Sequence, residues 1–457
     1  MSRLGQGRPQ RPAEIEPEPP PPGLAARVLA TAAVADVAGG RHTLDERFAP
    51  DSLAMRAPQM DDRDRALARS IATVSFRRLG SIRAALAQFL ERGLPRKAIG
   101  LEWMLVTAAA QILFMDAPDH AAVDLAVKMV RRDPKTAPFA SLANAVLRSL
   151  ARAKDELANP ADPWIDTPAW LAARWRKHFG QEAALAIVAA HRLEPTLDLT
   201  VRDDPEGWAR RLGGAVLPTG SVRLDSHAPV PQLPGYAEGR WWVQDAAAAL
   251  PARLLRATPQ DRVADLCAAP GGKAAQLAAT GARVVAVDKS AERMKRLAAN
   301  LTRLKLSADM EVADALGYSA PVFDAVLLDA PCTATGTVRR HPDVAWTKRI
   351  ADVATLAAAQ AKMLDRAASV TRPGGRIVYC VCSLEPEEGE AQITALLRRN
   401  PDLERWPIEA DEIGGLAECV NEAGEVRTLP SHLPDADPRR SGLDGFFAAR
   451  LRRKAHR

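Results

Sequence analysis

Cysteine is scarce in this 457-residue chain, and long apolar runs are missing from it. The five cysteines are an odd number and lack the paired spacing of a disulfide framework or a zinc site, so we expect a reducing compartment and no bound metal. No apolar stretch reaches the length of a membrane span, and the first residues lack the basic-then-apolar order of a secretory signal. These absences argue against a membrane protein and a secreted disulfide scaffold, and they predict a cytoplasmic protein.

The composition adds a mild bias toward nucleic acid. Hydrophobic residues make up 47% of the chain and charged residues 26%, as in ordinary globular proteins. The formal net charge is +6 and the pI is near 9.2. A basic balance favours a polyanionic partner, although many basic proteins bind no nucleic acid.

Four segments differ in their sequence pattern. Residues 1–22 are rich in Pro, Glu and Arg and predict a disordered tail. Apolar residues recur three and four apart through residues 23–157, which predicts a compact helical bundle. The pattern of residues 164–245 is mixed and predicts a small α+β subdomain. Strands and helices alternate through residues 246–457, which is typical of a doubly wound, Rossmann-like α/β domain.

Apolar stretches in the last segment are the expected strands of its sheet. They cover Val263–Cys267, Arg283–Asp288, Met310–Ala313, Val322–Asp329 and Arg376–Val381. A last strand over Gly445–Leu451 could join the sheet edge. Parallel sheets of this kind bind ligands at the carboxyl ends of their strands, so we expect the functional residues there.

The run from Asp265 to Lys273 leads a strand through a Pro-Gly-Gly turn into a helix. Such a turn lets the backbone approach a nucleotide-like ligand closely. It lacks the Gly-x-Gly-x-x-Gly of dinucleotide sites and the Gly-Lys-Ser/Thr ending of triphosphate sites, so S-adenosylmethionine fits better. Asp288, about 20 residues further on, is placed to bind a ribose, and Asp314 could bond the adenine. The alternative role for each aspartate is a helix N-cap.

Two cysteines follow the ends of expected strands. Cys332 closes the run Asp-Ala-Pro-Cys, and Cys382 closes the run Cys-Val-Cys. A thiolate that adds to carbon 6 of a pyrimidine activates carbon 5 for methylation, and a second group must then take the proton from carbon 5. Two thiols beside the cofactor therefore indicate a pyrimidine methyltransferase. The alternative is that a free cysteine is only a small buried hydrophobe, above all Cys267 and Cys380.

The residues around both cysteines resemble the motifs of RNA cytosine-5 methyltransferases. Asp329 to Gly336, continued by Arg339 to Trp346, is similar to the first cysteine motif of that family. Val378 to Ser383, followed by the acidic run Glu385 to Glu390, is similar to the second. The helical segment also resembles a NusB-like RNA-binding domain, notably at Gln111 to Phe114, His120 to Val123 and Asn144 to Arg148. Together these motifs resemble the bacterial Sun, or RsmB-type, 16S ribosomal RNA methyltransferases.

The resemblance implies a role for each site residue. Cys382 would be the nucleophile, Cys332 would help release the methylated product, and Asp329 would bond the target cytosine. The residues that would hold S-adenosylmethionine are Cys267, Ala268, Ala269, Pro270, Gly271, Gly272, Lys273, Asp288, Asp314 and Asp329. The expected partner is 16S ribosomal RNA, naked or in an early assembly intermediate, and we expect a monomer with no membrane partner and no metal.

Two features depart from the family pattern. Val381 stands where the family usually has Thr, and Cys380 adds a third thiol, so the choice of Cys382 depends on the following Ser383. Leu199 to Asp203 also departs from the usual Arg-Val-Asn ending, which affects the expected RNA contacts of the middle subdomain.

Two other functions stay open. A non-catalytic RNA-binding or antitermination-type factor on a methyltransferase scaffold would need no thiol. A methyltransferase for protein, small molecules or a base amino group would normally carry Asn/Asp-Pro-Pro-aromatic in place of Asp329 to Cys332.

Clusters of arginine predict where RNA would bind. A cytosine stacked in a helix cannot expose carbon 6, so the target must lie in a loop or be flipped out. Arg339 to His341 could contact phosphates beside the flipped base, or form a solvated loop. A further set could give the helical segment a basic face, or an ordinary solvated one: Arg65, Arg69, Arg77 and Arg78.

Overall fold

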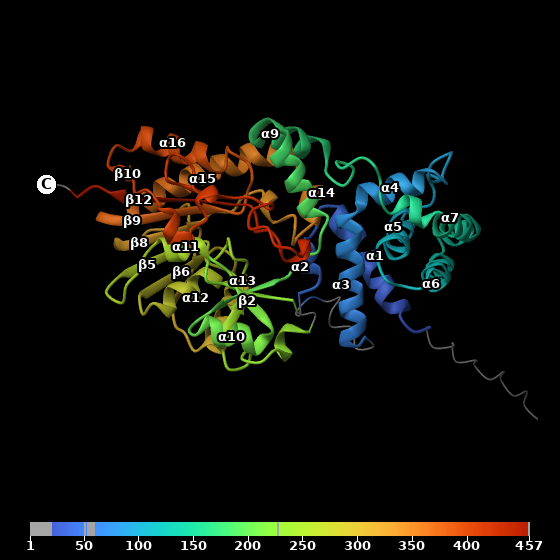
Figure 1. Ribbon diagram of the computed structural model, residues 1–457, viewed down its shortest axis with the longest axis horizontal. Helices are drawn as coiled ribbons and strands as arrows, with labels where there is room; N and C mark the ends of the chain where they lie inside the picture. The colour runs from blue at the N-terminus through green and yellow to red at the C-terminus, as the bar shows by residue number, and fades with distance from the viewer. Residues whose placement is uncertain (1–20, 50–51, 53–59, 226–227, 456–457) are drawn as a thin grey trace, which may run out of the picture.

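The computed structural model describes residues 21–49, 52, 60–225 and 228–455. The predicted tail lies outside the described residues, apart from its last two positions. A helical bundle occupies one side of the molecule, and the strands occupy the other (Figure 1). None of the described helices is long and apolar enough to cross a membrane.

The N-terminal helices pack around one central helix. α5 spans Leu101–Phe114, as predicted, and every residue from Met104 to Leu113 is buried, so the other helices surround it. The surrounding helices are α1 (Leu24–Ala38), α2 (Leu44–Arg47), α3 (Asp62–Arg77), α4 (Leu79–Ala87), α6 (Asp119–Arg132), α7 (Ala140–Arg152) and α8 (Lys154–Leu157). The predicted all-helical architecture of this part is confirmed.

A long helix and a small antiparallel sheet follow the bundle. α9 (Ala169–His191) is interrupted at Gly180, which has φ 83° and ψ 168°, so the two helices predicted here are its two halves. The sheet has the order β2-β3-β1-β4 and one accompanying helix. Its elements are β1 (Leu197–Val201), α10 (Pro205–Leu212), β2 (Gly214–Val216), β3 (Val222–Leu224) and β4 (Trp241–Val243). β1 and β4 match their predicted bounds, whereas β2 and β3, of three residues each, were not predicted.

An eight-stranded sheet forms the core of the C-terminal part, with the order β10-β12-β9-β8-β5-β6-β7 and β11 beside β12. Its strands are β5 (Arg262–Leu266), β6 (Arg283–Asp288), β7 (Asp309–Val312), β8 (Phe323–Asp329), β9 (Thr371–Val381), β10 (Leu403–Arg405), β11 (Val426–Thr428) and β12 (Phe446–Arg453). β5 to β9 pair in parallel, and β12 runs antiparallel to β9. The predicted last strand is present, but it lies inside the sheet between β9 and β10 and not at its edge.

Helices cover both faces of this sheet, so successive strand residues are buried on opposite sides. Leu328 packs in the cluster that contains α15, and Leu327 packs in the cluster that contains α11. The helices are α11 (Leu250–Leu254), α12 (Gly272–Ala279), α13 (Ala291–Leu304), α14 (Asp343–Thr347), α15 (Ile350–Val370) and α16 (Glu390–Arg399). The chain runs outward from β5 to β7 and then returns to β8, so the strand order switches between β5 and β8. The doubly wound α/β fold class is confirmed, and this switch point is where such folds bind ligands.

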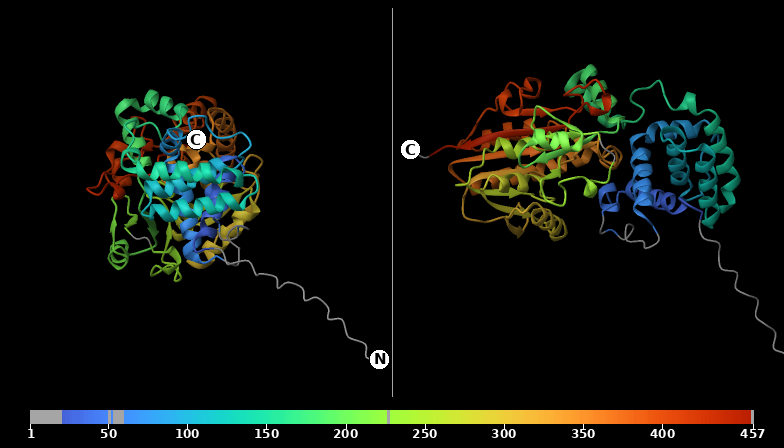
Figure 2. Two further views of the ribbon diagram at one scale, coloured as in Figure 1. Left: turned by 90° about the vertical axis from the view of Figure 1, so that its right-hand side faces the viewer. Right: turned by 60° about the horizontal axis from the view of Figure 1, so that its bottom comes forward.

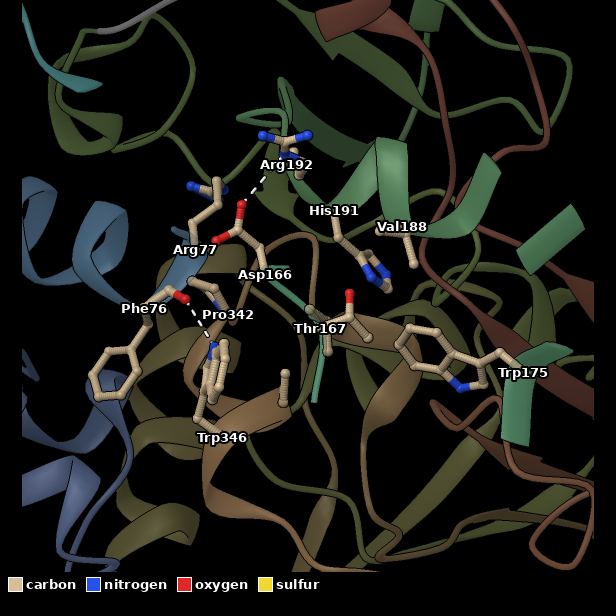
Figure 3. Close-up of a pocket in the computed structure, with 12 residues that line it drawn as sticks. Phe76, Arg77, Asp166, Thr167, Trp175, Val188, His191, Arg192, Pro342 and Trp346 are labelled. Atoms are coloured by element: carbon tan, nitrogen blue, oxygen red, sulfur yellow. Dashed lines mark hydrogen bonds and ion pairs between the residues drawn. The ribbon is translucent and has the colours of Figure 1, made fainter. Parts of the chain in front are cut away.

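The helical bundle contacts the C-terminal part through the segment around α14. The right-hand view of Figure 2 shows the helical bundle beside the part that contains the main sheet. Trp346 Nε1 donates to the Phe76 carbonyl at 2.9 Å, and Arg77 donates to the Arg339 carbonyl at 2.9 Å. Figure 3 shows the small cavity at this junction, which is lined by Phe76, Trp346, Asp166 and the buried imidazole of His191. The segment that follows Cys332 is therefore held by the N-terminal helices.

Candidate active site

A cavity of about 530 Å³ opens at the carboxyl ends of β5 and β8. Its volume lies within the usual range of small-molecule sites. The predicted residues that line it are Ala268, Ala269, Pro270, Gly271, Gly272, Lys273, Asp329 and Cys382. Trp242 and Gln244 of the small sheet form another part of the wall. The structure thus brings most of the predicted cofactor loop and one predicted thiol to a single cavity.

The glycine turn between β5 and α12 has the geometry that close ligand approach requires. Gly271 has φ +109°, and a Cβ at this position would lie 2.8 Å from Leu297 Cγ, so only glycine fits without strain. The first turn of α12 has no side-chain cap, which leaves its N–H groups available to a ligand. The Ala269 N–H donates to Asp288 Oδ2 at 3.2 Å, which fixes the turn against β6.

The two aspartates predicted to bind adenosine do not line the cavity. Asp288 is buried, and its Oδ1 also accepts from the Ser290 N–H at 2.9 Å, so it orders the loop after β6. Asp314 is exposed and accepts from the Leu316 N–H at 2.9 Å. Both carboxylates make the local backbone contacts of turn residues. Their contacts with ribose and adenine remain predictions.

Lys273 and Asp329 form an ion pair in the cavity wall. Lys273 Nζ lies 2.8 Å from Asp329 Oδ2, and the Lys273 ammonium also lies 5.0 Å from the centre of the Phe446 ring. Burial lowers the pKa of Lys273, but the Asp329 carboxylate outweighs it, so the net pKa shift is upward. Lys273 is therefore a fixed cation at neutral pH, and it holds Asp329 at the end of β8.

Asp265 is a site residue that the sequence did not single out. It lines the cavity and is fully buried, and among the described residues neither of its carboxyl oxygens has a hydrogen-bond partner. Burial, together with the Asp329 carboxylate, raises the pKa of Asp265 to about 8. The one available sequence signal was an acidic residue inside an otherwise apolar strand. An unpaired acceptor beside a roomy cavity fits a ligand with a positively charged amino group, as S-adenosylmethionine has.

The two predicted catalytic thiols lie together. The Cys332 and Cys382 sulfur atoms are 3.5 Å apart, with Cys382 at the cavity and Cys332 behind it. The contact with Cys382, with burial, raises the pKa of Cys332 well above its ordinary value. Cys380 is fully buried, and its sulfur lies 3.5 Å from Asp329 Oδ1. The cavity therefore exposes Cys382 and not Cys380.

Cys267 precedes the cofactor loop but does not line the cavity. It has φ +65°, and its side chain is partly buried beneath the loop. Burial and the surrounding aspartates raise the pKa of its thiol to about 12. Cys267 thus has the buried, protonated character of a structural cysteine.

The cluster Arg339 to His341 is not a solvated loop. Arg339 is 2% exposed and pairs with Asp245 at 3.0 Å and Asp444 at 3.3 Å. Arg340 pairs with Asp245 at 2.7 Å and with Asp198 at 3.2 Å, and it lines the cavity together with His341. The two guanidinium groups hold the small sheet and the C-terminal loop against this segment, and contact of Arg340 and His341 with RNA phosphates stays a prediction.

The four arginines expected to form a basic face do not share one exposed surface, because Arg77 and Arg78 are turned into the fold. Arg77 is buried at the junction with the catalytic part, where burial lowers its pKa to about 10. Arg78 donates to the Ala158 carbonyl at 3.0 Å. The other two pair with acids: Arg65 with Asp62 at 3.0 Å and Arg69 with Asp45 at 2.7 Å. These side chains therefore tie the bundle to itself and to its neighbours.

Comparison with known proteins identifies both parts of the chain. Residues 252–452 match the family described as 16S rRNA methyltransferase RsmB/F, and residues 24–152 match the NusB family. The chain is 34% identical over 420 residues to the ribosomal RNA small subunit methyltransferase B of Cronobacter sakazakii, with 87% of this chain and 92% of the relative covered. It is 37% identical over 447 residues to the protein of that name from Xylella fastidiosa, with 94% and 99% covered.

A solved structure shares the whole architecture. The crystal structure of PH0851 superposes with a TM-score of 0.71 and covers 95% of this chain and 99% of its own. Its sequence identity of 22% makes this a likeness of fold.

Proposed function

Because this chain belongs to the RsmB/F family of 16S ribosomal RNA methyltransferases, we propose that it transfers a methyl group from S-adenosylmethionine to carbon 5 of a cytosine in 16S ribosomal RNA. The observation that carries the proposal is the pair of thiols, 3.5 Å apart, with Cys382 lining the same cavity as the cofactor loop. Binding alone would need neither thiol.

Cys382 is the proposed nucleophile. Its thiolate adds to carbon 6 of the cytosine, and the electron pair of the ring double bond moves to carbon 5, which becomes nucleophilic. S-adenosylmethionine, when bound, supplies the electrophilic methyl group. A base then takes the proton from carbon 5, the ring double bond re-forms, and the Cys382 sulfur leaves.

Cys332 is the proposed partner in release. Its sulfur lies close enough to Cys382 to exchange a proton with the leaving thiolate or to act on the carbon 5 proton. The raised pKa of Cys332 means that it begins the cycle as a thiol, which can pass its own proton to the departing Cys382 sulfur and take the proton from carbon 5 in return. Loss of Cys332 would therefore leave the covalent protein–RNA adduct in place.

Lys273 and Asp329 are proposed to orient the cytosine. Asp329 Oδ2 is held by Lys273 at 2.8 Å, so its carboxylate has a fixed position in the cavity wall that Cys382 also lines. A carboxylate can accept a hydrogen bond from the cytosine amino group. Truncating either residue would misplace the base relative to Cys382.

The loop from Cys267 to Lys273 would hold the amino-acid end of the cofactor, with Asp265 accepting from its ammonium group. The free N–H groups at the start of α12 suit a carboxylate. Asp288 would bind the ribose and Asp314 the adenine edge. These contacts follow from the strand-end positions of the residues and from the family motif.

The proposed substrate is a loop or flipped-out cytosine, in naked 16S RNA or in an early assembly intermediate. We propose that residues 23–157 form the RNA-binding helical domain, that residues 164–245 form the small subdomain of the methyltransferase module, and that residues 246–457 form its catalytic domain. Each copy of the chain carries both thiols and the cofactor loop, so a monomer is sufficient. A ribosomal RNA substrate would place the reaction in the cytoplasm.

The test is to incubate wild type, Cys332→Ala and Cys382→Ala with 16S RNA and methyl-labelled S-adenosylmethionine, and to run denaturing gels. We expect label on the RNA with wild type, loss of label with Cys382→Ala, and a slow-migrating adduct with Cys332→Ala. Normal turnover by Cys332→Ala would overturn the two-thiol mechanism. No label and no adduct in any variant would favour a non-catalytic RNA-binding factor.

A further inference from the structure

A buried carboxylate lies between the two segments that carry the thiols. Glu388 is 0% exposed and follows Cys382 by six positions, yet it does not line the cavity. The described part of the chain gives it no cationic partner within ion-pair distance. A buried carboxyl without a counter-ion is expensive to keep unless several donors satisfy it.

The residue directly after each thiol donates to Glu388. Thr333 donates to Glu388 Oε1 from its backbone N–H at 2.9 Å and to Oε2 from its hydroxyl at 2.5 Å. Ser383 donates from its hydroxyl to Oε2 at 2.5 Å. One carboxyl group therefore ties the position after Cys332 to the position after Cys382.

Gln360 completes the arrangement from α15. Its Nε2 donates to Glu388 Oε1 at 3.1 Å and to the Pro331 carbonyl at 2.9 Å. The segment Pro331 to Thr333 is thus fixed on both sides of Cys332. The Gly336 N–H adds a direct link, since it donates to the Cys382 carbonyl at 3.1 Å.

We propose that Glu388 is a positioning residue that sets the approach of Cys332 to Cys382. Its relevance to methyl transfer rests on the function proposed above, whereas its effect on the thiol pair does not. Three features of the geometry support the role: the contacts fall on the residues next to both thiols, they join segments from different strands, and they are sealed from water.

The geometry also predicts which substitutions are tolerated. Oε1 faces two N–H groups that can only donate, whereas Oε2 faces two hydroxyls that can rotate and accept, with the Thr333 N–H at a longer 3.2 Å. Glu388→Gln can therefore keep the arrangement, with its amide nitrogen toward the hydroxyls. Glu388→Ala removes every contact at once. Glu387→Ala is the matched control, because Glu387 is half exposed and pairs with Arg174 on the surface.

The experiment measures the thiol pair directly by equilibrating the folded protein with oxidised and reduced glutathione. Two protein thiols and one glutathione disulfide give the Cys332–Cys382 disulfide and two glutathione thiols, and peptide mass spectrometry quantifies the bridged form. We expect Glu388→Ala to lower the equilibrium constant about tenfold or more, with Glu388→Gln within about threefold of wild type and Glu387→Ala unchanged. Methylation kinetics on 16S RNA should show the same order in kcat, with KM nearly constant.

A purely structural role for Glu388 gives a different result. Glu388→Ala would then lose thermal stability while its thiol equilibrium stayed that of wild type, and this result would overturn the proposal. If Glu388→Ala does not fold, Glu388→Met, which keeps the length of the side chain but not its carboxylate, replaces it, and an unchanged thiol equilibrium in that variant would overturn the proposal equally. If the thiol result holds but wild type methylates no RNA, the proposed function fails and the positioning role stands.

Discussion

The sulfur atoms of Cys332 and Cys382 lie 3.5 Å apart, although 50 residues separate them in the sequence. Each follows a strand of the same parallel pair, β8 and β9, so the sheet itself brings them to one edge. Cys380 lies on β9 as well but is sealed in the core. The position of a thiol relative to the cavity, and not its presence in the motif, therefore distinguishes the three.

Replacement of Cys380 by Ala should leave methylation within about an order of magnitude of wild type. The change removes one buried sulfur and should lower the free energy of unfolding by about 1 kcal/mol, because a small cavity replaces it. Cys382→Ala should reduce turnover to background with little loss of stability. The check is methyl transfer to 16S RNA beside urea unfolding of each variant. If the activity of Cys380→Ala fell to the background level, Cys380 and not Cys382 would be the nucleophile.

Replacement of Lys273 by Met should weaken both cofactor binding and turnover. Met keeps the length of the side chain but leaves the Asp329 carboxylate without its cation, so Asp329 loses its fixed orientation. We expect the Kd for S-adenosylmethionine to rise about tenfold to a hundredfold and kcat to fall as well. Isothermal titration calorimetry gives the Kd without catalysis. A Kd equal to that of wild type would show that Lys273 does not contribute to cofactor binding and acts only on the RNA substrate.

Cofactor binding should release a proton near neutral pH. The pKa of Asp265, raised to about 8 by burial and by Asp329, means that this carboxyl is mostly protonated at pH 7 in the free protein. An ammonium group placed against it would favour the charged form and expel the proton. Calorimetry at pH 7 in buffers of different ionisation enthalpy measures the release. Asp265→Asn should abolish it and weaken binding, and an undiminished release in that variant would contradict the assignment.

The same aspartate should make the free protein less stable as pH rises. An acid whose folded pKa lies above its unfolded value binds more protons when folded, so its contribution to stability is full below about 4 and is lost as pH rises to about 8. Asp265→Asn should remove this slope and be the more stable protein at pH 8. Urea unfolding of both proteins between pH 5 and pH 8 checks this difference. All other titrating groups are the same in the two proteins, so their contributions cancel in the comparison.

His191 should make the protein sensitive to acid. Burial lowers its pKa to about 3, with Arg339 and Arg77 adding to the shift. In the unfolded chain His191 takes up a proton at the ordinary histidine pKa. The contribution of His191 to the free energy of unfolding is therefore present above about pH 6.5 and is lost as the pH falls toward 3. His191→Phe, next to Trp175 (Figure 3), should lose less stability than wild type between pH 7 and pH 5. The exposed His120→Phe is the control and should follow wild type.

The sequence predicted six of the eight strands of the main sheet because their patterns are local, and it missed the three-residue strands β10 and β11. β6 has its predicted bounds, and α5, β1 and β4 match as well. A buried parallel strand reads as a continuous apolar run, and the glycine turn marks the end of β5. Strands of three residues, such as β2 and β3, carry too few side chains to show a period.

The charged residues were harder to interpret, because their roles depend on distant partners. Arg339 and Arg340 are adjacent to a catalytic motif, which suggested RNA contacts. Their acids, Asp198, Asp245 and Asp444, come from three separate parts of the chain and converge only in the fold. Asp265 differs from these acids, because no described residue donates a hydrogen bond to its carboxyl group, and this lack marks it as a ligand-binding residue.

The contacts between the helical bundle and the segment around α14 also imply an order in which the two parts of the chain fold during synthesis. Arg77 and Phe76 reach Arg339 and Trp346 across 262 and 270 residues of sequence. The helices leave the ribosome long before the catalytic strands do, and N-terminal domains generally fold first during synthesis. The segment after Cys332 therefore emerges when the surface that it packs against has already formed, before the later cavity residues Cys382 and Phe446 have been synthesised.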